Sequence, residues 1–102
     1  MSTHMKEKAN WSVKEGSFQI NYNLTYSVNS NFEEFELWEY GIQCELLDCN
    51  NTIISVANIN HITNNYERIL VLIQKLVNNN VFPIHLHDVI TDLLDEENLV
   101  VF

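Results

Sequence analysis

The feature that most constrains the fold is the segment 18–28, in which apolar and polar side chains alternate without a break. Such alternation places one set of side chains on each face of an extended strand. Aromatic and β-branched residues, which favour strands with one buried face, dominate the apolar set. Its members are Phe18, Ile20, Tyr22, Leu24, Tyr26 and Val28. The segment therefore predicts a strand that needs a covering layer on one side.

Two further strands are predicted downstream. Residues 33–47 also alternate, and their phase changes between Leu37 and Trp38, which predicts a bulge at that point. Gly41 is a second place where this strand could bend. An Asn-rich turn then leads into a third strand, Thr52–Ile59. Because the links between the three strands are short, an antiparallel meander is the favoured arrangement.

Beyond residue 60 the apolar period changes from strand to helix. Apolar residues between Tyr66 and Val77 recur at helical spacing, with Thr63 or Asn64 as the predicted cap. The Asn run 78–80 is expected to end this helix in a left-handed conformation, and Pro83 is expected in the first turn of a second helix. The apolar stripe of the second helix comprises Leu86, Val89, Ile90, Leu93 and Leu94.

Together these elements predict an α+β domain, a three-stranded antiparallel β-meander covered on one face by two C-terminal helices (β-β-β-α-α). Residues 1–5 resemble a cloning scar, 6–17 are expected to form an N-terminal arm, and 18–102 make up the single domain. The apolar end, Leu99–Phe102, follows the acidic run 95–97. We expect it to add a short strand to the sheet or to pack on another chain.

Length and charge exclude several functional classes. The chain has 102 residues, enough for one core, and 14 acidic against 5 basic residues give a formal charge of −9. Direct binding to nucleic acid is disfavoured, because phosphate recognition needs clustered Lys and Arg. The sequence contains no apolar run of membrane-spanning length and no secretory signal pattern. We therefore expect a cytoplasmic protein whose two cysteines are reduced thiols.

Three short segments carry a resemblance to a known family. They are Glu39-Tyr40-Gly41-Ile42, Asn58-Ile59 and the stretch from Val81 to Ile90. Over roughly residues 18–95 the chain resembles a family of small proteins from spore-forming Gram-positive bacteria that is known only as a domain of unknown function. The resemblance implies a bacterial, cytosolic, single-domain protein. It transfers no catalytic residue to this chain, because none is established for the family.

The residues that could bind a metal are Cys44, Cys49, His85 and His87. A zinc site needs about four convergent ligands, whereas these are predicted on a strand, in a turn and on diverging sides of a helix. We therefore expect no metal, no cofactor, a buried Cys44 and an incidental Cys49. A disulfide between the two is disfavoured, since it would cross a tight hairpin in a reducing compartment.

The second predicted helix places His85, Asp88 and Asp92 on one face. A histidine beside a carboxylate is the minimal acid–base pair. The sequence offers no evident nucleophile with its base, and its two glycines form no phosphate-binding loop. We therefore predict a solvated polar face and no catalytic residue. A metal-dependent hydrolase using His85, His87 and Asp88 remains a distant alternative.

The charge distribution carries the functional prediction. No Lys or Arg occurs between Glu15 and Glu67, so the acidic residues of this segment are not offset by basic ones. This distribution predicts a surface that attracts a basic protein. Trp11, which lies in the polar arm, is a candidate interface anchor that could instead pack back over the sheet. Trp38 and Tyr40 share one face and are expected in the core. The predicted partner-binding residues are Glu33, Glu34, Glu36, Glu39, Glu45, Asp48 and Trp11.

These observations favour a small acidic, non-catalytic protein-binding module. Its expected role is that of an inhibitor or regulator that covers a basic surface of a larger partner, such as nucleic-acid-handling machinery. Phage anti-restriction and anti-CRISPR proteins offer an analogy in size and charge. One alternative is that the acids only keep the chain dispersed. Another is a structural or assembly protein, a homodimer formed through an exposed strand edge or through Leu99–Phe102.

Overall fold

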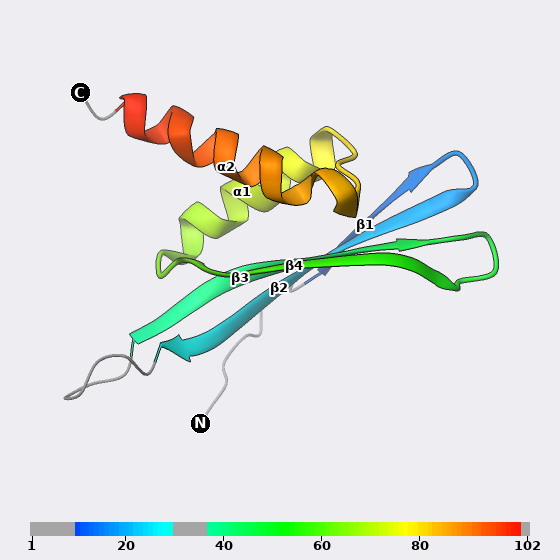
Figure 1. The fold of residues 1–102 in the computed structure, drawn as a ribbon, viewed down its shortest axis with the longest axis horizontal. Coiled ribbons are helices and arrows are strands. Elements are labelled where there is room, and N and C mark those ends of the chain that lie inside the picture. Colours follow the sequence, from blue (N-terminus) through cyan, green and yellow to red (C-terminus); the bar gives the residue numbers. More distant parts are fainter. Residues whose placement is uncertain (1–9, 30–36, 101–102) are drawn as a thin grey trace.

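The computed structural model describes the backbone of residues 10–29 and 37–100, and the side chains of 10–27 and 38–95 among them. A four-stranded sheet precedes two helices along the chain (Figure 1). The elements are β1 (Asn10–Glu15), β2 (Phe18–Asn29), β3 (Leu37–Leu47), β4 (Ile53–Thr63), α1 (Tyr66–Asn78) and α2 (Pro83–Val100). The α+β class and the antiparallel meander are therefore confirmed.

The sheet has four strands in the order β1-β2-β3-β4, so the prediction of three strands is wrong. The additional strand is β1, which comes from the segment expected to be an N-terminal arm. It pairs with β2 from Asn10 opposite Asn23 to Glu15 opposite Phe18. Gly16 and Ser17 form the two-residue turn, and Gly16 has a φ of 63° that suits this residue.

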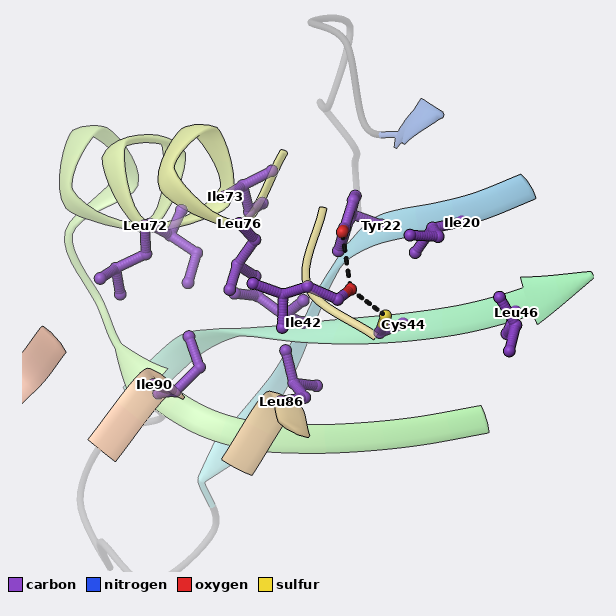
Figure 2. Close-up of a cluster of buried hydrophobic side chains, with 12 residues drawn as sticks. Ile20, Tyr22, Ile42, Cys44, Leu46, Leu72, Ile73, Leu76, Leu86 and Ile90 are labelled. Atoms are coloured by element: carbon purple, nitrogen blue, oxygen red, sulfur yellow. Dashed lines mark hydrogen bonds between the residues drawn. The ribbon is translucent and has the colours of Figure 1, made fainter. Parts of the chain in front are cut away.

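Both helices pack on the same face of the sheet, as predicted (Figure 1). The buried side chains of β2 and β3 are those that the alternation places on one face, and they meet the apolar stripes of α1 and α2 (Figure 2). Burial of this apolar area is the main stabilising contribution of the fold. The core consists of Ile20, Tyr22, Ile42, Cys44, Leu46, Ile69, Leu72, Ile73, Leu76, Val81, Leu86 and Ile90.

The bulge lies in a different place from the one predicted. β2 and β3 pair in continuous register through Trp38 opposite Val28 and Leu37 opposite Asn29. The irregularities lie between β3 and β4, around Gly41 and near the β3–β4 turn. At the first of them His61 on β4 adopts a φ of 61°, which accommodates extra residues opposite Gly41. Gly41 is therefore the bend site, as its sequence position suggested.

The helix boundaries follow the predicted signals with two corrections. The N-cap of α1 is Asn65, one residue beyond the predicted cap, and its side chain accepts a hydrogen bond from the Arg68 amide at 3.0 Å. Asn80 follows α1 with a φ of 51°, and Pro83 begins α2, both as predicted. α2 runs through the acidic residues to Val100, so Leu99 and Val100 are helical rather than a short strand. Residues 101–102 lie outside the described chain.

Gly41 allows β3 and β4 to approach each other closely. A Cβ atom at this position would collide with the backbone oxygen of Ile59 and lie 3.0 Å from the Cα of Asn60. We predict that Gly41→Ala lowers the free energy of unfolding by about 2–3 kcal/mol, because backbone atoms must move to accept the methyl group. Gly16→Ala is the control, since it meets nothing within 4 Å and adds only the strain of a positive φ, about 1 kcal/mol. Urea unfolding measures both, and equal costs would contradict this explanation of the bend.

Candidate functional site: the uncovered face of the sheet

The face of the sheet opposite the helices is mostly polar and becomes apolar at Leu47, Ile53 and Val56, and no described helix or strand covers it. The strand register assigns its members, because every second residue of each strand points away from the core. Their side chains are half-buried or exposed. They include Ser12 and Lys14 on β1, Gln19, Asn21, Asn23, Thr25 and Ser27 on β2, Glu39, Gln43 and Glu45 on β3, and Val56 and Asn58 on β4.

Side-chain hydrogen bonds connect neighbouring strands across this face. The Ser12 hydroxyl on β1 donates to the side-chain oxygen of Asn21 on β2 at 2.7 Å. Within β2, the Gln19 amide donates to the same oxygen at 2.8 Å. Farther along, the Asn23 amide donates to the Gln43 side-chain oxygen at 3.0 Å. These cross-strand pairs hold the amide groups in fixed positions. The surface thus presents hydrogen-bond donors and acceptors of Asn, Gln and Ser side chains in an ordered array.

Glu39 makes a contact that the sequence did not reveal. Its Oε1 atom lies 3.0 Å from Nδ1 of His61 on β4. The positive φ of His61 at the β4 irregularity is the local backbone feature that accompanies this contact. A carboxylate beside an imidazole forms an ion pair when the imidazole is protonated. The pair fixes Glu39 on the uncovered face next to the bend.

The other predicted acids have different environments. Glu45 is half-buried on the uncovered face, with Asn21 opposite it on β2 and Val56 opposite it on β4. Asp48 instead caps the β3–β4 turn, because its Oδ1 accepts hydrogen bonds from the Asn50 amide at 2.8 Å and the Thr52 amide at 3.0 Å. The role that the structure gives Asp48 is therefore to shape the turn. Glu33, Glu34 and Glu36 lie outside the described residues.

Trp11 lies on the helix side of the sheet. Trp11 is a residue of β1 and pairs with Tyr22 on β2. Its side chain is partly buried and packs against the hydrophobic core. Trp11 is therefore part of a strand and not of an arm, and its role as an interface anchor stays a prediction. The regular spacing of Trp11 and Val13 on β1 was the available signal for this placement.

A row of aromatic rings extends the helix side of the sheet beyond the core. The ring centroids of Trp38 and Tyr26 are 5.1 Å apart, those of Tyr26 and Tyr40 are 5.9 Å apart, and those of Tyr40 and Tyr66 are 5.6 Å apart. Tyr40 packs against the core, as predicted. Trp38 is 49% exposed and not a core residue, because it pairs with Val28 toward the β2–β3 end of the sheet, where the sheet and α2 diverge (Figure 1).

Two core side chains donate to one backbone oxygen. The Tyr22 hydroxyl lies 2.7 Å and the Cys44 thiol 3.7 Å from the carbonyl oxygen of Val81, which belongs to the α1–α2 link (Figure 2). Burial, and secondarily the Glu45 carboxylate, raises the pKa of the Cys44 thiol from 9.0 to about 12. Burial likewise raises the pKa of Tyr22 well above its usual range. Both groups therefore remain protonated at neutral pH, and the Cys44 thiol is a poor nucleophile.

The candidate metal ligands do not form a cluster in the described chain. Cys44 is buried and free, whereas Cys49 is exposed and free in the β3–β4 turn. His85 and His87 are exposed on α2. Among the described residues, no cluster of three or more His, Cys, Asp and Glu side chains has a metal-binding arrangement. Neither described helix has the length and apolar content needed to cross a bilayer.

The raised pKa of the Cys44 thiol predicts a loss of stability at alkaline pH. The unfolded chain releases the thiol proton near pH 9.0, while the native chain retains it until about pH 12. Stability that is fully present below about pH 9 is therefore lost as the pH rises through this interval, by up to about 1.4 kcal/mol per pH unit. Cys44→Ala should reduce this slope and Cys49→Ala should leave it unchanged. Urea unfolding across the alkaline range tests this, and equal slopes in all three proteins would contradict it.

Comparison with known proteins identifies a family for this chain. The family model described as "Family of unknown function (DUF6514)" matches residues 1–96, which include all four strands, α1 and most of α2. No curated protein and no solved structure matches the chain. The resemblance to an uncharacterised family is thus confirmed, and the bacterial origin that it implied stays a prediction. Since the match spans almost the whole chain, the chain belongs to this family of unknown function, DUF6514.

Proposed function

We propose that this protein is a small, non-catalytic binding module that docks the uncovered face of its sheet onto a basic surface of a larger protein. One observation carries the proposal. Glu39 and Glu45 lie on that face, and β2, β3 and β4 contain no Lys or Arg. The helices occupy the other face, so the polar face is the broad surface left for a partner.

The arrangement of charge supports a basic partner. The chain carries a formal charge of −9, and Lys14 on edge strand β1 is the basic residue that the register assigns to the uncovered face. A negative surface attracts positively charged partners over a distance of about 8–10 Å at physiological ionic strength. Such attraction raises the association rate and favours the correct orientation of the partner. The overall charge therefore provides the long-range attraction of the partner, and Glu39 and Glu45 form the direct contacts with its basic side chains.

The neutral residues of the face support specificity. The side-chain amides of Asn21, Asn23 and Gln43 take part in cross-strand hydrogen bonds before a partner arrives. Fixed groups lose little conformational freedom on binding, which increases affinity for a surface of complementary shape. We therefore assign to the module the role of an inhibitor or regulator, which acts by covering its partner's basic surface, for example one that otherwise holds nucleic acid.

Differential capture from an extract of the source cells tests the proposal. The immobilised proteins are the wild type, a Glu39→Gln/Glu45→Gln variant, and an Asp92→Asn/Asp95→Asn variant of the exposed side chains on α2. Each variant loses two negative charges, so the effect of net charge is matched. We expect proteins that the wild type and the α2 variant retain and that the sheet variant loses, with at least a tenfold loss of affinity.

Salt dependence and folding provide the controls. Retention should weaken as ionic strength rises, because exposed charges are screened. Urea unfolding of the sheet variant shows whether loss of the Glu39–His61 contact unfolds the domain, and Glu45→Gln alone provides a variant that leaves that contact intact. Equal retention by the folded sheet variant and the α2 variant would contradict docking through this face.

A further inference from the structure

The two edges of the sheet differ in their protection against pairing with another strand. β1 has 6 residues and carries both Lys14 and Glu15, and the side-chain amide of Asn80 donates to Glu15 at 2.6 Å. β4 has 11 residues and contains no Asp, Glu, Lys, Arg or Pro. Charged residues, proline and short length are the usual devices that prevent edge-to-edge pairing. β1 has two of them. β4 has none of these three, and its irregular pairing with β3 at two places is the further device of this kind that it carries.

The β4 edge is also apolar near the β3–β4 turn. Ile53, Ile54 and Val56 are 51%, 52% and 46% exposed. The pairing of β4 with β3 shifts register near His61 and again between Ser55 and Ile53, so these three apolar residues flank the second irregularity. In the described chain β3 is the strand hydrogen-bonded to β4, so the other edge of β4 has backbone groups available for a further strand.

We propose that β4 pairs antiparallel with β4 of a second copy, joining two sheets into one across a twofold axis. The distribution of charge selects a second copy as the occupant. Two chains that each carry −9 repel one another, so a self-interface is favoured where the chain has no acids, and β4 is such a surface. A twofold axis near Ser55 places Ile54 of one copy opposite Val56 of the other, so that exposed apolar side chains cover one another.

This interface is compatible with the proposed function but does not depend on it. Strands that join edge to edge leave both faces of the sheet unchanged. The uncovered faces of the two copies would then lie side by side, and their acids would form one larger surface. If the protein is monomeric, the docking proposal still holds. The capture experiment that tests docking measures partner retention through Glu39 and Glu45 and does not depend on the assembly state.

The test compares two matched lysine substitutions by light scattering over a series of protein concentrations. Val56→Lys adds a charge to the β4 edge, and Val71→Lys makes the same change at an equally exposed position, 50%, on α1. We expect the wild type and Val71→Lys to have twice the 12.0 kDa monomer mass and Val56→Lys to have the monomer mass. A wild type that is monomeric at every concentration, or a dimer that persists in Val56→Lys, would overturn the proposal.

Cysteine crosslinking provides a measurement that does not require disruption of the interface. In a Cys49→Ser background, single cysteines are introduced at Ile54, Ser55 or Val56, with Val71→Cys as the control. A residue on a twofold axis faces its own copy, so one β4 position should form a disulfide-linked dimer on mild oxidation. Absence of a crosslink at all three β4 positions, or equal crosslinking at Val71→Cys, would overturn the β4 pairing.

Discussion

The carbonyl oxygen of Val81 connects the two layers of this protein. It belongs to the link between α1 and α2, and it accepts hydrogen bonds from the Tyr22 hydroxyl and the Cys44 thiol in the middle of the sheet. A buried carbonyl without a partner would cost several kcal/mol, so both donors make this position of the link the favoured one. With the link fixed there, both helices lie on one face. The opposite face remains available to a partner.

The sequence predicted the parts of the fold that local periodicity determines. Alternation along residues 18–28 predicted β2 and its buried face, and Asn80 and Pro83 marked the break between the helices. β1 was missed because six residues with two apolar side chains give a weak pattern, although Gly16-Ser17 was an adequate signal for a two-residue turn. The extent of α2 was also missed. Its acidic residues were interpreted as a tail, whereas Glu is a good helix former and neither Gly nor a further Pro occurs between Pro83 and Val100.

The candidate site was less predictable than the fold, because it depends on contacts between strands. The alternation of side chains along β3 is enough to place Glu39 and Glu45 on the face away from the core. Alternation could not reveal the contact between Glu39 and His61, which requires the irregular pairing around Gly41. Nor could it show that Asp48 is committed to its own turn. Net charge is the basis of the proposed class of partner, and the proposed docking face rests on the position of Glu39 and Glu45 opposite the helices.

Unfolding of two tyrosine variants is the most direct test of this account. Tyr22→Phe removes the hydroxyl that donates to Val81 and keeps the ring, while Tyr26→Phe makes the same change on a side chain that is 39% exposed. The account predicts that urea unfolding near neutral pH shows a loss of about 1–3 kcal/mol for Tyr22→Phe. It predicts a change within about 0.5 kcal/mol for Tyr26→Phe. Equal stability of the two variants would show that the Val81 carbonyl does not hold the helices on the sheet.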